Sequence, residues 1–201
     1  MSFDKSEYDG KKANSVEHSR LRAWTYVGLM MVAILITLPT TPILWRAATK
    51  VFGPEFNAIG YVIFFLAFIG FGIYMFLQRS KFDAVGLVSL IGFALVYYYL
   101  LRYQCQFPAE RLHLLEYGLL AYLLYRAFRM NFPKVGAYAL GFLIASGFGF
   151  LDEAIQYILP NRVFEMRDVM TNVLAAGMGL LAVEVLLRPD SGRIPLHGAT
   201  K

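Results

Sequence analysis

The sequence predicts an all-α fold, a polytopic membrane helical bundle of about six transmembrane helices with both termini in the cytoplasm. The chain of 201 residues is 58% hydrophobic and only 16% charged, whereas a soluble domain carries about 25% charged residues. The apolar residues gather in six runs, each near the ~20 residues that a helix needs to cross a bilayer. Lys and Arg residues fall mainly between these runs, where they orient membrane helices.

The two ends of the chain are polar. Residues 1–22 mix basic and acidic side chains without apolar periodicity, so we expect an N-terminal tail that is disordered or lies on a surface. Residues 23–187 are expected to form the transmembrane bundle, and residues 188–201 a second polar tail. A chain of this length has no room for a second folded domain.

Six spans follow from the apolar runs. They are expected at residues 23–38, 58–77, 84–101, 112–128, 135–159 and 168–187. The first run lacks a small-x-small cleavage site at its end and is therefore interpreted as a retained signal-anchor helix. The last three spans are less uniformly apolar, because ionisable residues lie near one end of each.

Loop charges predict the orientation. Of the 19 Lys and Arg residues, 13 lie on the side that holds both termini, counting Arg126 as a helix-end residue, and six lie on the other side. The positive-inside rule therefore predicts cytoplasmic termini in a plasma (inner) membrane protein.

Polar side chains in three separate segments reach the opposite, outer side in this topology. Within each segment two of them are three or four positions apart, which places them on one helix face. A charge at membrane depth costs a few kcal/mol and normally finds a partner inside the bundle. We therefore expect one shared polar pocket. Its candidate residues are His113, Glu116, Glu153, Gln156, Asp168 and Asn172, with Arg111, Arg162 and Arg167 beside them.

These residue types indicate two kinds of chemistry. The candidate acid–base residues are His113, Glu116, Glu153 and Asp168. The candidate ligand-binding residues are Arg111, Gln156, Arg162, Arg167 and Asn172, because guanidinium groups form bidentate bonds to phosphate. We expect no cofactor, and a Gly-rich phosphate loop is missing. A metal site of His113, Glu116, Glu153 and Asp168 is conceivable but disfavoured, because a compact His-x-x-x-His motif is missing, so we expect no metal. Whether the chain catalyses a reaction stays open.

Two hypotheses of different kinds remain open. The first is an outward-facing pocket that binds or processes an anionic, phosphorylated or lipid-linked envelope component. The second is a non-catalytic scaffold or accessory subunit whose polar network only locks helices together. A transporter is disfavoured because no internal repeat is evident. Nucleic acid is disfavoured because the basic residues do not cluster on a soluble face. The bilayer is the expected partner, and protein partners are unknown.

Three stretches resemble the VanZ-like family. Arg111-Leu-His113-Leu-Leu-Glu116 resembles the family's first motif, in which a His opens a helix, although Glu110-Arg111 stands where Asp-Lys is common. The run from Glu153-x-x-Gln156 through Pro160-x-Arg162 to Asp168-x-x-x-Asn172 resembles its later motifs. The resemblance covers about residues 108–187 and implies a small bacterial membrane protein of the cell envelope. The family's namesake is linked to teicoplanin resistance, and the family has no settled biochemical activity.

Overall fold

The computed structural model describes residues 5–77, 83–105, 110–159 and 164–187, with side chains from residue 14 to residue 185. Every regular element in these ranges is helical, which confirms the all-α prediction. The elements are α1 (Lys5–Phe52), η1 (Pro54–Ala58), α2 (Ile59–Leu77), α3 (Ala84–Tyr99), η2 (Leu100–Gln104), α4 (Arg111–Phe128), α5 (Lys134–Ile158) and α6 (Met166–Leu187).

Five helical segments of the described chain are long and apolar enough to cross a membrane. They are Asn14–Phe52, Pro54–Leu77, Ala84–Gln104, Lys134–Ile158 and Met166–Val185. The sixth long helix, α4, matches the expected span over residues 112–128 in position but carries Arg111, Glu116 and Arg126 within 18 residues. The structure therefore supports a multi-pass membrane bundle, with α4 as its least apolar member.

Helix α1 differs from the expected first span. It begins at Lys5 and therefore includes most of the polar segment for which we expected a disordered or surface-lying tail. It also continues through Pro39 and Pro42 to Phe52. The physical reason at the N-terminus is that Lys, Arg and Glu propagate helix well once an apolar helix provides the nucleus.

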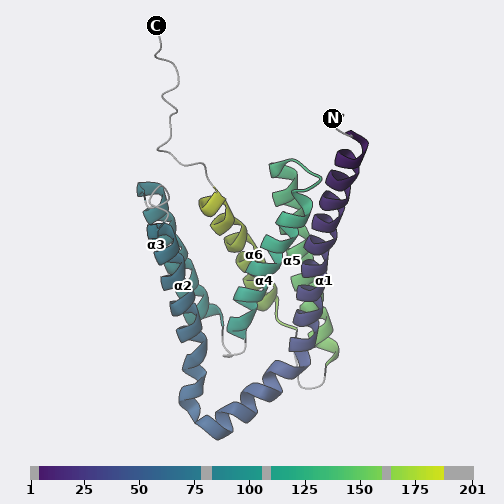
Figure 1. The fold of residues 1–201 in the computed structure, drawn as a ribbon. Coiled ribbons are helices and arrows are strands. Elements are labelled where there is room, and N and C mark those ends of the chain that lie inside the picture. The colour runs from purple at the N-terminus through teal and green to yellow at the C-terminus, as the bar shows by residue number, and fades with distance from the viewer. Residues whose placement is uncertain (1–4, 78–82, 106–109, 160–163, 188–201) are drawn as a thin grey trace.

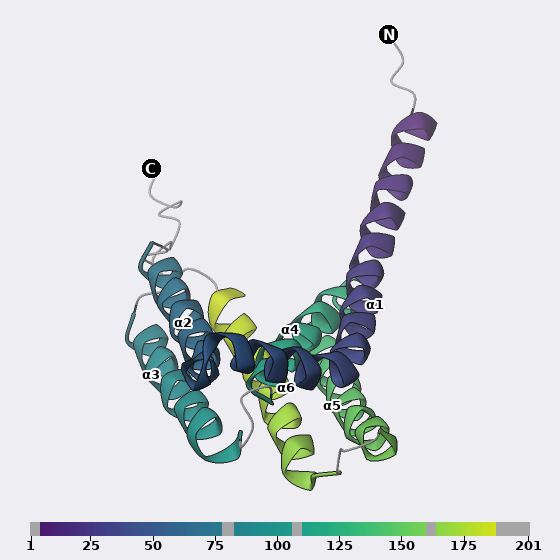
Figure 2. The ribbon, with the colours of Figure 1, turned by 90° about the horizontal axis from the view of Figure 1, so that it is seen from below.

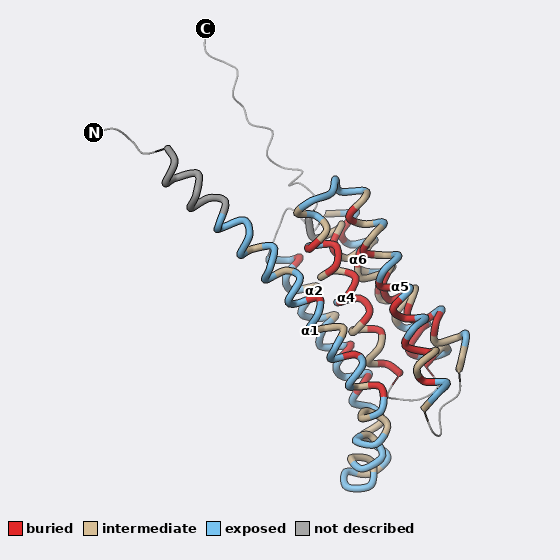
Figure 3. The backbone as a smooth tube through the Cα atoms, turned by 90° about the vertical axis from the view of Figure 1, so that its right-hand side faces the viewer, coloured by how far each residue is buried: buried red, intermediate tan, exposed pale blue. Residues whose placement is uncertain are grey.

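The one long helix of the described chain that lacks an apolar membrane-crossing stretch, α4, occupies the centre of the bundle. Helix α4 packs against α1, α5 and α6, and Figure 3 shows buried residues concentrated in α4, α5 and α6 while α1 is mostly exposed. Helices α2 and α3 stand beside this group (Figure 1). The outer surface is apolar, with 65% of Phe65 and 63% of Leu143 exposed. Neighbouring helices thus shield α4 from lipid, which explains how it tolerates its charges.

Glycines bring α4 close to both of its later neighbours. A Cβ added at Gly141 of α5 would lie 3.2 Å from the backbone nitrogen of Tyr125 in α4. The spacing Ala175-x-x-x-Gly179 of α6 packs on Gly118 of α4, because a Cβ at Gly118 would meet Ala175 O at 3.4 Å. Small residues thus allow the backbone approach that drives helix association in membranes.

The direction of the helices separates the two ends of the bundle. Figure 1 shows the start of α1 and the end of α6 at one end of the molecule, and the starts of α4 and α6 and the end of α5 at the other. The predicted polar residues that the structure describes lie at or near these latter helix ends, far from the start of α1 and the end of α6.

Candidate functional site

A network of polar side chains begins on one face of α4. His113 lies in the first turn, and Glu116 and Tyr117 follow three and four residues later, so the helical repeat aligns all three. His113 Nδ1 lies 3.1 Å from Glu116 Oε2. Only 13% of the His113 side chain and 17% of the Glu116 side chain are exposed. The pair is therefore held inside the bundle, as its spacing predicted.

Helix α5 brings three polar side chains to the same depth. Gln156 donates from Nε2 to Asp152 Oδ1 and to Glu153 Oε1, both at 3.0 Å. All three residues are buried, with 2% or less of each exposed. The Gln156 amide thus donates a hydrogen bond to each of two neighbouring carboxylates, which offsets part of the free-energy cost of burying Asp152 and Glu153.

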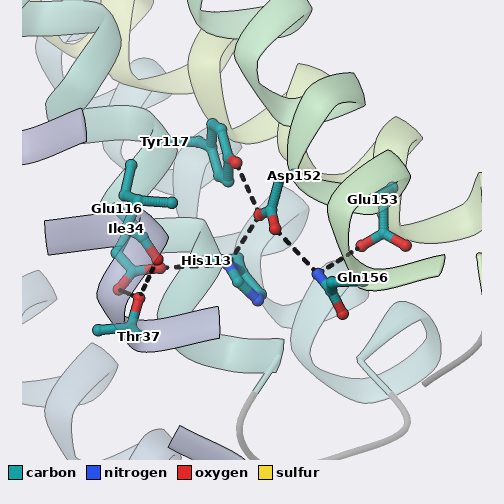
Figure 4. A network of polar contacts seen from close by, with 8 residues as sticks. All are labelled: Ile34, Thr37, His113, Glu116, Tyr117, Asp152, Glu153 and Gln156. Carbon is teal, nitrogen blue, oxygen red and sulfur yellow. Dashed lines mark hydrogen bonds and ion pairs between the residues drawn. The ribbon is translucent and has the colours of Figure 1, made fainter. Parts of the chain in front are cut away.

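Asp152 joins the α5 residues to α4. Tyr117 donates its hydroxyl proton to Asp152 Oδ2 at 2.7 Å, and His113 Nδ1 lies 3.7 Å from the same oxygen. Figure 4 shows these side chains converging from the two helices. The centre of the network is therefore an imidazole beside the carboxylates of Glu116 and Asp152.

Helix α1 closes the network on a third side. The hydroxyl of Thr37 lies 2.7 Å from Ile34 O and 3.3 Å from Glu116 Oε1, so its single proton is shared between two acceptors. Residues separated by 79 positions thus meet at Glu116 (Figure 4). This contact explains why the start of α4 is covered although it is polar.

A second group of charges surrounds Arg167 near the start of α6. Its guanidinium lies 2.7 Å from Glu165 Oε2, 3.1 Å from Asp168 Oδ1 and 3.5 Å from Glu110 Oε2. The backbone N–H of Glu165 donates to Glu153 Oε2 at 3.3 Å, which joins this Arg167 group to the network on α5. Asp168 therefore reaches the site through Arg167 and Glu165.

Asn172 lies deeper in the bundle. It is 1% exposed, and a Cβ added at Gly149 would lie 2.8 Å from Asn172 Cβ and 3.3 Å from Tyr117 Cε1. Gly149 thus permits α6 to approach the tyrosine that bonds Asp152. The amide nitrogen of Asn172 is buried without a hydrogen-bond partner, so a donor next to the network has spare capacity.

The structure does not bring Arg111 into the network. Its Nη1 donates to Asn57 O at 2.6 Å and its Nη2 to the Tyr61 hydroxyl at 3.1 Å. The guanidinium carbon also lies 3.9 Å from the centroid of the Tyr61 ring. Arg111, which is 7% exposed, therefore joins α4 to η1 and α2. Arg162, the other rim arginine expected from sequence, falls outside the described residues.

Three network residues were not among the candidates from sequence: Thr37, Tyr117 and Asp152. Two of them carried a usable signal, because His113–Tyr117 and Asp152–Gln156 are both i, i+4 pairs on helix faces already singled out. Asp152 precedes Glu153 at the polar end of its span, but the sequence prediction rests on the spacing of Glu153 and Gln156. Thr37 carried no signal, because nothing in the sequence indicates which face of α1 meets α4.

The arrangement suits proton exchange better than the binding of a metal ion. An imidazole next to two carboxylates can gain and lose a proton with little movement of heavy atoms. From this centre the hydrogen bonds continue through Asp152, which accepts from Tyr117 and Gln156, to Glu153, which also accepts from Gln156. In the part of the chain that the structure describes, no three His, Cys, Asp or Glu side chains are grouped so as to hold a metal ion.

Comparison with known proteins identifies one family. The model of the VanZ/LLP1 family matches residues 1–187. The match includes α1, α2 and α3 and therefore extends beyond the stretch of residues 108–187 over which the motifs resemble the family. No curated protein and no solved structure matches the chain.

Proposed function

Because the chain belongs to the VanZ/LLP1 family, we propose that its polar network is an outward-facing membrane site for an anionic or lipid-linked component of the bacterial cell envelope. The motif residues of the family resemblance supply much of the network, among them His113, Glu116, Glu153 and Gln156. The family's link to teicoplanin resistance agrees with an envelope ligand.

One observation carries the proposal: buried ionisable side chains from α4 and α5 meet inside a bundle of apolar helices. Asp152 is 0% and Glu153 1% exposed. Ionisable groups at membrane depth are expensive, and they mark ligand or proton pathways in membrane proteins. Close packing of the helices does not require these acids, because glycines such as Gly118 and Gly141 already allow the backbones to approach.

The charge distribution suggests how a ligand would lie. Carboxylates outnumber cations in the described network, so its interior repels a bare phosphate. Arg167 lies in the first turn of α6, and its Nη2 atom is buried without a hydrogen bond of good geometry. We therefore place the anionic group at Arg167 and a hydroxyl or amine of the ligand next to His113.

The proposed role of His113 follows from its neighbours. The carboxylates of Glu116 and Asp152 lie on its Nδ1 side at 3.1 and 3.7 Å. They orient the ring and stabilise its protonated form, so that the other ring nitrogen exchanges a proton with the ligand. Gln156 keeps Asp152 and Glu153 in place for this purpose.

The direct test measures lipid binding. The purified protein in lipid nanodiscs is titrated with a polyprenyl phosphate, and with the matching polyprenyl alcohol to separate the phosphate from the chain. Loss of one charge-assisted contact of about 1.5–3 kcal/mol predicts roughly tenfold to a hundredfold weaker binding of the phosphate by Arg167→Gln. Arg126→Gln, an exposed arginine at the other end of α4, is the matched control.

Two results would refute this assignment. One is equal affinity for the phosphate and the alcohol. The other is an unchanged affinity in Arg167→Gln that is shown to fold by its thermal stability. A folded Arg167→Lys variant should fall between wild type and Arg167→Gln, because it keeps the charge but loses the planar donor pair.

The orientation of the site has its own test. A cysteine at Glu55, an exposed residue near the network end, should react with a membrane-impermeant maleimide in intact cells. A cysteine at Ser15, near the start of α1, should react only after the membrane is opened. The reverse pattern would place the site on the cytoplasmic side.

A structural role is the second candidate, and the hydrogen bonds favour it in one respect. The central contacts join different helices: Tyr117 of α4 bonds Asp152 of α5, and Thr37 of α1 contacts Glu116 of α4. Glu153→Gln separates the two functions. In a ligand site this variant loses activity or binding and keeps its thermal stability, whereas in a helix-locking network its stability falls first.

A further inference from the structure

Helix α1 is too long to be a simple transmembrane span. Its 48 residues would extend roughly 72 Å at 1.5 Å per residue. The hydrocarbon core of a bilayer is only about 30 Å thick. Part of α1 therefore lies outside the hydrocarbon core, and the question is where its second half goes.

Two prolines divide α1 close to the network. Pro39 and Pro42 lie inside the helix, and a proline removes one backbone hydrogen bond and bends the helix. The hydroxyl groups of Thr37 and Thr40 lie 2.7 Å from Ile34 O and Ile36 O. Figures 1 and 2 show that the helix changes direction after this region and runs sideways towards the start of α2.

The sideways segment, residues 43–52, has two chemically different rows on its exposed side. Ile43, Ala47 and Val51 are spaced four residues apart and form an apolar row, with 59% of Ile43 and 75% of Val51 exposed. Arg46 and Lys50, also four apart and exposed, form a basic row next to it. A short helix with exposed apolar and basic rows is typical of helices that lie in a membrane interface.

Aromatic contacts fix the segment to η1. Trp45 donates from Nε1 to Asn57 Oδ1 at 2.8 Å, and its ring centroid lies 5.1 Å from that of Phe56. Phe52 stacks on Phe56 at 5.8 Å. Gly53 makes the turn between the two helices with φ of 84°, a conformation that favours glycine. The exposed rows are thus held in a fixed orientation.

From these features we infer that residues 43–52 form an interfacial helix that binds the lipid headgroup layer at the network end of the bundle. The apolar row enters the outer part of the acyl chains, and Arg46 and Lys50 contact lipid phosphates. Trp45 lies at headgroup depth, where tryptophan is enriched in membrane proteins. The basic side chains of Arg46 and Lys50 complement the negative charge of lipid phosphates. Because α1 is longer than the hydrocarbon core is thick, its second half also has to lie near the headgroup layer. Both points favour lipid over a protein as the partner of this segment.

The segment is also joined to the polar network. Asn57 accepts the indole proton of Trp45 on its side chain and the Arg111 proton on its carbonyl oxygen, at 2.8 and 2.6 Å. Arg111 begins α4 two residues before His113. A lipid headgroup bound at Arg46 and Lys50 therefore lies on a helix that is linked through Asn57 of η1 to the start of α4, which gives the network a route to the lipid layer. This inference does not depend on the proposed ligand.

Spin labels test the depth of the segment in vesicles of phosphatidylethanolamine and phosphatidylglycerol. In a Cys105→Ala background, single cysteines at Ile43, Ala47, Val51, Arg46 and Lys50 are labelled with a nitroxide. Collision with oxygen is then compared with collision with a water-soluble nickel chelate. Labels at Leu143, exposed in the middle of α5, and at Ser15, exposed in the polar first part of α1, give the hydrocarbon and water references.

The inference predicts an alternating result. The three apolar-row labels should collide more with oxygen and report depths between the two references, while the two basic-row labels should collide more with the chelate. Five labels that all match Ser15 would show a segment that stands away from the bilayer. Five that all match Leu143 would show a segment inside the hydrocarbon core. Either outcome overturns the inference.

A second measurement uses tryptophan fluorescence and needs neither the Cys105→Ala change nor a spin label. The chain has two tryptophans, so Trp24→Phe leaves Trp45 as the fluorophore. Quenching by lipids brominated at successive acyl positions should be strongest for the bromine nearest the headgroup. Strongest quenching by the deepest bromine would place Trp45 inside the hydrocarbon core. No quenching at all would place it away from the bilayer. Either result contradicts the assignment.

Discussion

Gly179 of α6 and Gly118 of α4 lie in direct backbone contact. A Cβ at Gly179 would fall 2.6 Å from Gly118 Cα, closer than real Cβ atoms approach. The atom in the way belongs to the backbone of the central helix, so a side-chain rotation cannot relieve the overlap. This crossing sets the distance between the two helices that carry His113 and Asp168.

Gly179→Ala should therefore destabilise the protein. We expect a loss of about 1–3 kcal/mol from overpacking, measured as a lower unfolding temperature in detergent. Gly177→Ala in the same helix is the control, because its Cβ would meet Phe142 at an ordinary 3.6 Å. That control should be neutral or slightly stabilising, since Ala favours helix over Gly. Equal effects of the two changes would contradict the close crossing.

The Tyr117–Asp152 hydrogen bond should show energetic coupling. A double-mutant cycle with Tyr117→Phe and Asp152→Asn, read by denaturant unfolding, isolates the pair term. Interhelical hydrogen bonds in membrane proteins give about 0.6 kcal/mol on average and at most about 1.7. Tyr157→Phe, on a residue that is 71% exposed, should show no coupling to Asp152. A coupling of zero for Tyr117 would mean that the bond does not form in the membrane.

Gln156→Glu should make stability depend on pH. The change replaces the amide that donates to Asp152 and Glu153 by a third acid at 3.0 Å from both. Protonation at low pH restores a donor and removes the repulsion, so the variant should be closest to wild type near pH 5 and lose stability as pH rises. Unfolding temperature against pH tests this. Gln156→Met removes the donor without adding an acid, so its stability should depend on pH less steeply than that of Gln156→Glu.

Arg111→Lys should loosen α2. Lysine keeps the charge but not the two donor contacts to Asn57 and Tyr61 or the planar stack on the ring. Amide hydrogen exchange across residues 59–77 should therefore increase. Arg102→Lys, on an exposed arginine, is the control and should leave exchange unchanged. No increase for Arg111→Lys would show that α2 is held in place by other contacts.

Cys105 should react slowly with thiol reagents. Burial and the nearby acids Glu110 and Asp168 raise the pKa of its thiol to about 12. The thiolate is the nucleophile, so alkylation at pH 8 should be roughly a thousandfold slower than for an ordinary exposed cysteine of pKa about 8.5. The rate should increase about tenfold per pH unit up to the pKa. A Tyr103→Cys, Cys105→Ala variant provides the exposed reference.

Much of the architecture was predictable from local composition. The runs that predicted spans near residues 58–77, 84–101, 112–128, 135–159 and 168–187 each coincide with a helix. Crossing a bilayer demands about 20 apolar residues whatever the rest of the chain does, so this signal is local. The extent of α1 was not predictable in this way, because neither a polar stretch nor two prolines necessarily ends a helix that is already formed.

The site was predictable in part for a related reason. Helical spacing placed His113 with Glu116 and Glu153 with Gln156, and the structure keeps both pairs together. The same reasoning could not decide that Arg111 turns away to Tyr61 on α2. It also could not decide between Asp152 and Glu153, since adjacent residues on a helix point about 100° apart.

The sequence by itself determined that this chain is a bundle of membrane helices with polar residues at one end of the last three. The tertiary structure alone decided that α4, which carries Arg111, Glu116 and Arg126, is the central helix. It also decided that Tyr117, Asp152 and Thr37 complete the network and that Arg111 fastens α2. The physical reason is that hydrophobicity and helical period act within one segment, whereas a partner across helices depends on how neighbouring helices are rotated. Close contacts such as that of Gly118 with Gly179 fix how α4 and α6 face each other.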